Sequence, residues 1–281
     1  MSLPALVAVT MVAFAANSLL NRVAISSDAA EPASFSAIRV TSGALVLLLV
    51  AARTKQAAPL FETRRILPAL ALTSYFLGFS FAYQTLDAGL GALILFGGVQ
   101  LTMFGGGLAA GERPPALRWL GMVVGLFGLT LLFWPFGTGA DVNPVGAGLM
   151  MVAALGWGVY SLGGRASAAP IGDTAISFTY AAPLVVAAWV ISGETTIPTQ
   201  TGVALAVLSG VVTSALGYVL WYSVLPRLDA SVAALAQLTV PIIAVMGGAL
   251  FLGETVDARL ALSTALVLGG VALGIATTRE R

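Results

Sequence analysis

The chain has 281 residues, of which 58% are hydrophobic and only 9% are charged, and its mean hydropathy is +0.97. Soluble domains carry about 25% charged residues, so this composition is that of an integral membrane protein. The net charge of +1 does not favour nucleic acid as a partner, and the absence of both Cys and His excludes disulfides, thiolate chemistry, zinc sites and imidazole bases.

Ten apolar segments are long enough to cross a bilayer, whose hydrocarbon core of about 30 Å requires roughly 20 residues of helix. Pro32, Pro114 and Pro144 lie where helices should begin, and Asp87 and Asp229 precede two of the segments as N-caps would. The first segment lacks the basic start of a signal peptide, so we interpret it as a spanning helix. The sequence therefore predicts an all-α integral membrane protein with ten transmembrane helices, at residues 3–23, 32–52, 66–85, 88–109, 115–136, 144–165, 171–192, 201–225, 230–252 and 258–277.

An internal duplication relates the two halves of the chain. The stretch 86–112 aligns without a gap on the stretch 228–254, and both contain an Asp near the start, a Gly-Gly pair and a closing Gly-Glu. Apolar composition alone would match some Leu and Ala, but not all of these positions. We therefore expect a first repeat at residues 1–139 and a second at 140–281. The identical pairs are Leu86/Leu228, Asp87/Asp229, Ala88/Ala230, Ala92/Ala234, Leu93/Leu235, Gly105/Gly247, Gly106/Gly248, Leu108/Leu250, Gly111/Gly253 and Glu112/Glu254.

The distribution of Lys and Arg predicts the orientation. If the N-terminus is cytoplasmic, the outside loops hold only Arg22 and Arg259, and both termini face the cytoplasm. Because each repeat has an odd number of helices, the second repeat enters the membrane in the opposite sense. Such inverted repeats are typical of alternating-access transporters, and the two repeats of one chain suffice for a pathway, so we expect a functional monomer. The basic residues of the inside loops are Arg53, Lys55, Arg64, Arg65, Arg113, Arg118, Arg165, Arg227, Arg279 and Arg281.

Several short motifs resemble those of the drug/metabolite transporter superfamily, EamA type. They are FSAIR at residues 35–39, WGVYS at 157–161, LTVP at 238–241 and LGE at 252–254. Within that superfamily the chain is most similar to the YddG-type amino-acid exporters of bacterial inner membranes. The resemblance implies export of amino acids or related metabolites from a central cavity.

Arg39 is the one basic residue well inside a predicted helix. A charge at the bilayer centre costs at least about 2.5–3.5 kcal/mol, so this side chain should face protein or water. It either contributes to a substrate site or has a structural role, bonded to backbone carbonyls or extended toward the outer surface. No carboxylate lies near a helix centre. This argues against a proton-coupled pump for lipophilic cations and favours facilitated or exchange transport, although a coupling ion held by backbone carbonyls is compatible with the sequence.

Polar and aromatic residues at mid-depth are further candidates for a substrate site, because lipid cannot satisfy their hydrogen bonds. The same residues can instead connect helices or form packing surfaces, and Tyr83 fits the interfacial aromatic belt. We predict that helices one, three, four, six, seven, eight and nine line a cavity. Helices five and ten, with Gly121-x3-Gly125 and Gly270-x3-Gly274, should pack closely at the periphery. The predicted substrate-binding residues are Asn17, Arg39, Phe79, Gln100, Trp157, Tyr160, Tyr180, Tyr218, Trp221 and Gln237.

These features predict a transporter of the inner membrane that exports neutral amino acids, aromatic ones among them, and related small metabolites, with no cofactor and no metal. The scarcity of basic residues at depth disfavours phosphorylated substrates. A broad-specificity exporter of drugs or metabolites is the alternative of the same class. An intramembrane enzyme would need a His, metal ligands or paired acids at depth, which the sequence lacks. A scaffold protein is a further alternative.

Overall fold

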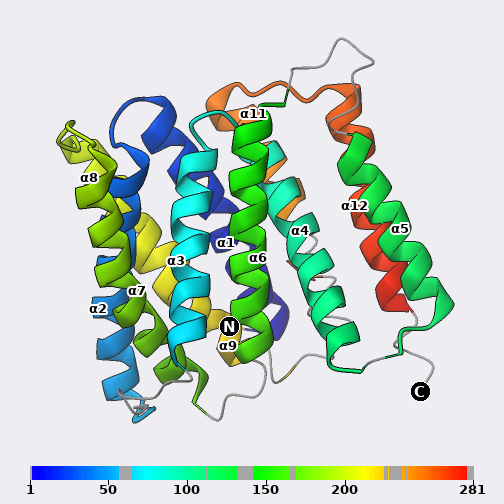
Figure 1. Cartoon of the computed structure of the whole chain (residues 1–281), viewed down its shortest axis with the longest axis horizontal. Coiled ribbons are helices and arrows are strands. Elements are labelled where there is room, and N and C mark those ends of the chain that lie inside the picture. Colours follow the sequence, from blue (N-terminus) through cyan, green and yellow to red (C-terminus); the bar gives the residue numbers. More distant parts are fainter. Residues whose placement is uncertain are drawn as a thin grey trace.

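The computed structural model describes residues 2–56, 65–111, 113–131, 142–164, 169–224, 227, 236–237 and 239–276, and the elements in these ranges are helices (Figure 1). Each coincides with one of the predicted segments, or with part of one. They are α1 (Leu3–Ser26), α2 (Pro32–Arg53), α3 (Ile66–Ala82), α4 (Ala88–Ala109), α5 (Ala116–Leu131), α6 (Pro144–Gly164), α7 (Pro170–Ser192), α8 (Gln200–Leu208), η2 (Ser209–Leu216), α9 (Gly217–Val224), α11 (Thr239–Leu252) and α12 (Ala258–Ala276). The predicted N-cap Asp229 and the repeated Glu112 lie outside the described residues.

Within the described residues, six helical spans are long and apolar enough to cross a membrane. They are α1, α2, α4, α6, α7 and the continuous run Gln200–Val224, which comprises α8, η2 and α9. The other apolar helices, α3, α5, α11 and the first part of α12 (Ala258–Gly270), are shorter. The chain is therefore a multi-pass membrane protein.

Helix ends follow the local sequence signals. Pro32 occupies the first position of α2, where the missing N–H costs nothing. Gly111 follows α4 and Gly253 follows α11, with positive φ of 84° and 66°. A residue in this left-handed conformation ends a helix, and glycine adopts it without strain. In both duplicated stretches, the glycine of the closing Gly-Glu pair therefore ends a helix.

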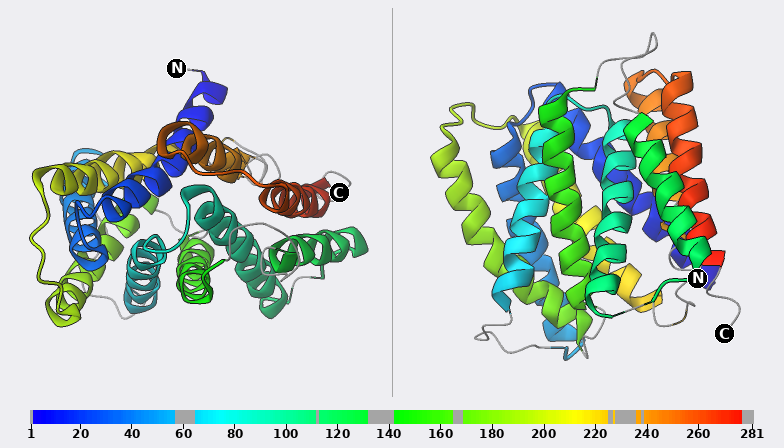
Figure 2. Two further views of the ribbon diagram at one scale, coloured as in Figure 1. Left: turned by 90° about the horizontal axis from the view of Figure 1, so that it is seen from above. Right: turned by 45° about the vertical axis from the view of Figure 1, so that its right-hand side comes forward.

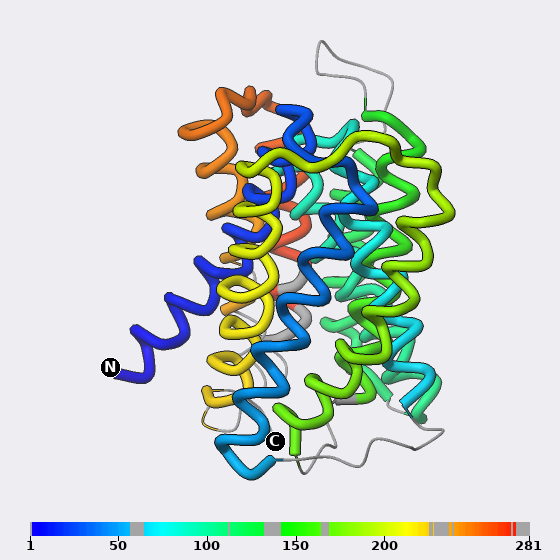
Figure 3. Tube along the Cα trace, turned by 90° about the vertical axis from the view of Figure 1, so that its left-hand side faces the viewer, coloured from blue at the N-terminus to red at the C-terminus, as the bar shows by residue number. Residues whose placement is uncertain are grey.

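The helices stand in two facing rows when the bundle is seen from above (Figure 2, left). One row holds α8, α9, α1, α11 and α12, and the other holds α7, α3, α6, α4 and α5, with α2 at one edge between the rows. The connections α1–α2, α3–α4, α7–α8 and α11–α12 lie together at one end, which we call the α1–α2 end (Figure 1). The first turns of α1 project away from the bundle (Figure 3).

Helices of the first half pack against helices of the second half in a reciprocal pattern. The second, fourth and fifth helices of the two halves pair with each other, as α2 with α7, α4 with α11 and α5 with α12. In addition, α3 packs on α6, and the equivalent run α8–η2–α9 packs on α1. At the crossing of α5 and α12, a Cβ at Gly270 would lie 2.6 Å from Gly125 N and would also overlap Gly121 O. The predicted close packing of these two helices is confirmed.

The predicted single helix at residues 201–225 contains a π-helical segment, η2, which the sequence analysis did not anticipate. This segment packs on α2 with almost no side chain between the backbones, because a Cβ at Gly210 would overlap Arg39 O and Ser42 Oγ. π-helical turns are rare and occur often at functional sites. Here the segment turns Ser209, Thr213 and Ser214, all buried, into the bundle.

Candidate functional site

A small cavity lies between the two halves of the chain, near the middle of the bundle. Its volume is about 20 Å³, enough for roughly one water molecule. The wall is built by α1, α3 and α4 of the first half and by α6, η2 and α9 of the second. The lining residues are Phe14, Asn17, Ser18, Tyr75, Phe79, Leu95, Phe96, Trp157, Thr213 and Tyr218.

Asn17 connects α1 to both halves through its side-chain amide. Its Oδ1 accepts hydrogen bonds from Ser209 Oγ at 2.6 Å and from Thr213 Oγ1 at 3.0 Å, so both lone pairs are used. Its Nδ2 donates a longer bond of 3.4 Å to the hydroxyl of Tyr75 on α3. Asn17 is 5% exposed, and a buried amide is stable only when such partners satisfy it.

Arg39 on α2 lies next to this cavity and is fully buried, at 0% exposure. Its Nε donates to Ser214 Oγ at 3.1 Å, and its Nη2 donates to the Tyr75 hydroxyl at 3.0 Å. The guanidinium carbon lies 5.2, 4.7 and 5.2 Å from the ring centroids of Tyr75, Phe76 and Phe79. Attraction to the faces of these rings offsets part of the cost of burying the cation.

Aromatic rings from five helices, α1, α3, α4, α6 and α9, surround the cavity. The Trp157 ring on α6 lies 5.2 Å from Tyr75, 5.0 Å from Tyr218 and 6.5 Å from Phe14. Tyr218 also packs edge-on against Phe14 at 5.9 Å. Each of these pairs lies within the range in which aromatic rings attract one another beyond their apolar burial. The wall therefore offers several ring faces beside the hydrogen-bonding groups of Asn17, Tyr75 and Thr213.

A second buried polar chain connects α1, α3 and α2. Ser80 Oγ donates to Asn21 Oδ1 at 2.7 Å, and Ser36 Oγ donates to Ser80 Oγ at 2.8 Å. None of these three residues lines the cavity. We interpret it as interhelical structure.

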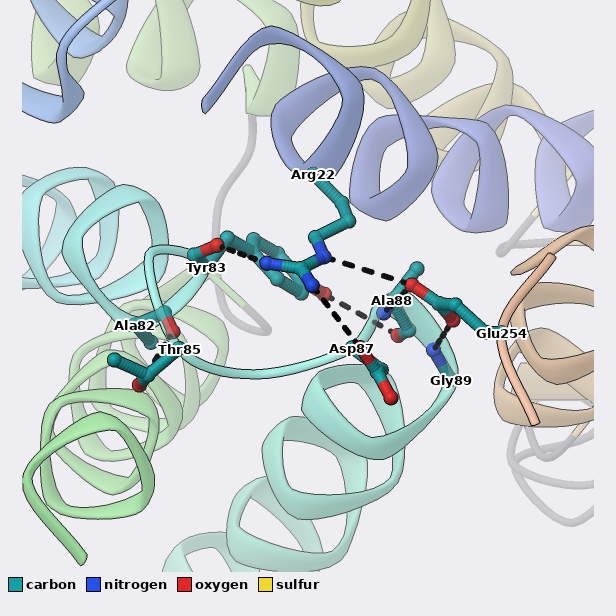
Figure 4. Close-up of polar contacts among 8 residues, drawn as sticks. All are labelled: Arg22, Ala82, Tyr83, Thr85, Asp87, Ala88, Gly89 and Glu254. Atoms are coloured by element: carbon teal, nitrogen blue, oxygen red, sulfur yellow. Dashed lines mark hydrogen bonds and ion pairs between the residues drawn. The ribbon is translucent and has the colours of Figure 1, made fainter. Parts of the chain in front are cut away.

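An ionic cluster around Arg22 lies at the α1–α2 end (Figure 4). Arg22 Nη1 donates to the carbonyl oxygen of Tyr83 at 2.9 Å, and Nη2 donates to Asp87 Oδ1 at 3.1 Å. Its Nε lies 3.6 Å from Glu254 Oε1. The cluster joins α1 and the α3–α4 connection of the first half to the end of α11 in the second half.

Glu254 caps the N-terminus of α4 from the opposite half of the chain (Figure 4). Its carboxylate accepts from Ala88 N at 2.7 Å and from Gly89 N at 3.3 Å. Asp87 occupies the predicted N-cap position, but its side chain makes no capping bond, because Arg22 engages it instead. Burial raises the pKa of the Glu254 carboxyl above its ordinary value, although the N–H groups of Ala88 and Gly89 and the Arg22 cation act in the opposite direction.

Glu194 forms the same kind of cap on α2. It follows Gly193, which ends α7 with a positive φ of 72°. Its carboxylate accepts from Ala33 N at 2.6 Å and from Ser34 N at 2.8 Å. A carboxylate at a helix N-terminus satisfies free N–H groups and interacts favourably with the helix dipole. Two helices of the first half are thus capped by carboxylates of the second half.

Comparisons with known proteins give these features a context. A protein of Pseudomonas aeruginosa, "Uncharacterized protein PA1977", is 43% identical over 277 residues, which cover 96% of this chain and 93% of that protein. Residues 144–275 match the model of the EamA-like transporter family. The chain belongs to the EamA-like transporter family. One solved crystal structure is 18% identical and superposes over 97% of this chain and 98% of its own, with a TM-score of 0.66, which shows a shared fold.

Membership of the EamA-like family makes the chain a membrane permease of the drug/metabolite type. Within the residues that the structure describes, no group of three or more His, Cys, Asp or Glu side chains is placed to hold a metal ion. The candidate site of this EamA-like transporter consists of aromatic rings and hydrogen-bonding side chains.

Most of the predicted substrate-binding residues lie in or beside the cavity of the EamA-like transporter. The cavity lining includes Asn17, Phe79, Trp157 and Tyr218. Arg39 contacts two lining residues, Tyr75 and Phe79. A second group touches wall residues from outside: Trp221 packs on Phe14 at 6.1 Å, and Tyr160 packs on Trp157 at 5.7 Å. Gln100, Tyr180 and Gln237 are partly buried and do not line the cavity. For all ten residues, the role in substrate binding stays a prediction.

Two expectations about the helices need correction. Tyr83 is fully buried and packs edge-on against Phe79 at 4.9 Å, so its assignment to the interfacial belt is wrong. Among the described residues, α7 and α11 contribute none to the cavity wall, and the first part of the predicted ninth helix lies outside the described residues. One residue shows why for α7: Phe178 packs on Phe76 and Tyr218, so that α7 forms a layer behind the wall.

Sequence analysis missed Tyr75 and the hydroxyl residues of η2. Tyr75 is the only wall residue that bonds both Asn17 and Arg39 among the described contacts. Its signal was its helical spacing from Phe79 on the same face of α3. The hydroxyls of Ser209, Thr213 and Ser214 stand in an otherwise apolar stretch, and their spacing was the available signal.

Proposed function

We propose that this EamA-like transporter exports neutral amino acids, aromatic ones among them, and related metabolites across the bacterial inner membrane by alternating access. The observation that carries the proposal is the cavity between the two halves, whose wall combines aromatic rings with the polar groups of Asn17, Tyr75 and Thr213. Rings accommodate an apolar side chain, and the polar groups replace water around its polar end.

The size of the cavity supports a transport cycle with at least two conformations. At about 20 Å³ it is far smaller than an amino acid, so the halves must separate before a solute of that class enters. The ionic cluster around Arg22 and the caps formed by Glu194 and Glu254 close the α1–α2 end. A route through the centre therefore requires these contacts to break and re-form.

The reciprocal packing supports an inverted repeat of two five-helix units with ten spans. An inverted repeat exchanges its halves by a twofold rotation, so equivalent helices pair with each other and every other contact has a counterpart. This rule is followed by the pairs α2–α7, α4–α11 and α5–α12. It is also followed by α3 on α6, whose counterpart is the run α8–η2–α9 on α1. Both halves of the chain contribute residues to the cavity wall, and a functional monomer is part of this proposal.

Cysteine labelling tests the orientation, because the chain has no native Cys. Ser27→Cys and Thr54→Cys form a matched pair, since both residues are exposed and each follows the last residue of its helix. With cytoplasmic termini, an impermeant maleimide added to intact cells labels residue 27 and not residue 54. The reverse result would overturn the proposed topology.

Flux in reconstituted vesicles tests the function itself. Vesicles containing the purified protein are incubated with a mixture of amino acids, purine nucleosides and hydrophobic cations, and their contents are identified by mass spectrometry. We expect uptake of neutral amino acids, aromatic ones among them. Flux that does not depend on the protein for any solute in the mixture would contradict a transport function.

A broad-specificity exporter of drugs or metabolites is the second candidate. The observation that favours it is the mostly apolar and aromatic wall, which fits many solutes. In the same experiment, uptake of nucleosides or hydrophobic cations at rates similar to those of amino acids would support this second function over the first.

A further inference from the structure

Arg39 is a buried cation without an ionic partner in the described part of the chain. Its exposure is 0%, and none of the ion pairs among the described residues includes it. The guanidinium is permanently charged, and a buried charge without a counter-charge is costly even when rings and hydroxyls surround it. The hydroxyls of Ser214 and Tyr75 are neutral, so they reduce this cost and leave the charge in place.

One nitrogen of the guanidinium also lacks a hydrogen-bond acceptor. Nε and Nη2 each have a partner, whereas Nη1 is buried with none among the described residues. Buried N–H groups in proteins are nearly always paired, so an exception requires an explanation, such as a water molecule or a ligand that binds there. Within the described residues, the surroundings of Arg39 therefore lack one negative charge and a hydrogen-bond acceptor for Nη1.

The position of Arg39 connects this deficit to the central cavity. Tyr75 and Phe79 stack on the guanidinium and also line the cavity. The Tyr75 hydroxyl is held weakly on its other side, because its bond from Asn17 Nδ2 is 3.4 Å long. An incoming acceptor can thus replace the Tyr75 hydroxyl at Arg39 if this hydroxyl gives up its long bond from Asn17 and its interaction with Tyr218.

We propose that Arg39 binds the carboxylate of the transported solute, an inference that rests on the proposed transport function. A carboxylate supplies both the missing charge and two acceptor oxygens in the planar geometry that a guanidinium matches. Among the described residues, the cavity wall offers no acidic side chain to an ammonium group, and Asn17 Oδ1 already accepts two bonds. The required group of the substrate is therefore its carboxylate, and its amine is tolerated but not required.

A set of solutes with one skeleton tests this assignment on the unmodified protein. The competitors are 3-phenylpropionate, its amide and 3-phenylpropylamine, each measured against the flux of labelled phenylalanine in reconstituted vesicles. We expect the carboxylate to compete at least as well as unlabelled phenylalanine, and the amide to be about tenfold weaker or more, the loss of one charge-assisted pair. The amine should not compete. Equal competition by amide and carboxylate would overturn the role of Arg39.

Variants assign the preference to Arg39 itself. Arg39→Gln should abolish discrimination between carboxylate and amide, whereas Arg39→Lys, which keeps the charge without the planar fork, should retain part of it. Arg22→Gln is the matched control, because it removes an arginine of the end cluster and should leave the selectivity ratio unchanged. A purely structural Arg39 would slow all solutes equally and leave the ratio intact. If Arg39→Gln does not fold, the solute set on the parent protein still decides.

A binding measurement separates this proposal from the proposed function. The carboxylate should raise the melting temperature of the detergent-solubilised parent protein, and the amide should not. This shift without flux would contradict transport while supporting the Arg39 site. Flux of phenylalanine without a carboxylate preference would contradict the site and support transport. Neither shift nor flux would contradict both.

Discussion

Arg22 and Glu254 join the two halves of the chain at the α1–α2 end, where Arg22 Nε lies 3.6 Å from Glu254 Oε1. The two side chains are only 20% and 9% exposed, so water screens the pair less than it would at an open surface. Because the same carboxylate also caps α4, a single residue holds both α1 and α4 of the first half. Separation of the halves at this end must break both contacts.

Replacing Glu254 should therefore favour opening at the α1–α2 end. In a Ser18→Cys background, whose thiol lies in the cavity wall, Glu254→Ala should increase maleimide labelling from that face about twofold to thirtyfold, since a lost cap costs about 0.5–2 kcal/mol. Labelling is compared in right-side-out and inside-out vesicles. Glu31→Ala is the control, because among the described contacts the Glu31 side chain accepts only from Thr196 N, at 3.0 Å and in an exposed position. Equal labelling of both variants would contradict a closing role for Glu254.

The raised pKa of Glu254 predicts how stability depends on pH. The folded protein holds this proton more tightly than the unfolded chain, whose carboxyl titrates near its ordinary value of 4.5. Stability from this group is then present below that value and is lost as pH rises through the folded pKa. We expect the melting temperature of the parent, measured relative to Glu254→Gln, to fall across this window. A rise would show that Arg22 and the two N–H groups outweigh burial.

Two neighbouring glycines of α12 should respond differently to alanine. Gly270→Ala should destabilise the protein by about 1–3 kcal/mol, the usual cost of overpacking, because its Cβ would overlap the backbone of α5 at Gly121 and Gly125. Gly269→Ala should be neutral or slightly stabilising, since nothing lies within 4 Å of its Cβ position. Both should leave solute selectivity unchanged. Thermal denaturation in detergent measures the difference, and similar melting temperatures would contradict the crossing.

Tyr75 and Ser74 form another adjacent pair with different expectations. Tyr75→Phe removes the hydroxyl that accepts from both Arg39 and Asn17, which should cost about 1–3 kcal/mol of stability and lower phenylalanine flux. Ser74→Ala should stay within about 0.5 kcal/mol, because the Ser74 hydroxyl donates only to the carbonyl of Leu70 in its own helix. The measurements are melting temperature and flux. Parent-like flux in Tyr75→Phe would show that this hydroxyl does not serve transport.

Features that depend on one stretch of sequence could be predicted here, whereas features that depend on packing between helices could not. Pro32 and Gly253 mark helix ends by their own backbone preferences, and the depth of Arg39 in an apolar segment already indicated a buried charge. Asp87 shows the limit. The sequence identified its position, but Arg22 and Glu254, far away in the chain, decide that a different carboxylate caps α4.

The candidate site shows the same division. Asn17, Trp157 and Tyr218 stood out as polar or aromatic residues in apolar segments, and they line the cavity. The π-helical segment η2 could not be predicted in this way. Its wider turn depends both on backbone hydrogen bonds and on the close contact of Gly210 with α2. No local propensity specifies it. The set of hydroxyls that meets Asn17 therefore became visible only in the folded bundle.

The caps on α2 and α4 also have a consequence for biosynthesis. The carboxylate that caps Ala88 comes 166 residues later in the chain, which a ribosome adds in roughly 10–30 seconds. The one that caps Ala33 comes 161 residues later. During this interval both helices begin with free N–H groups at the membrane, where water or lipid headgroups must satisfy them. The first half of the protein therefore reaches its final structure only after the second half has been inserted.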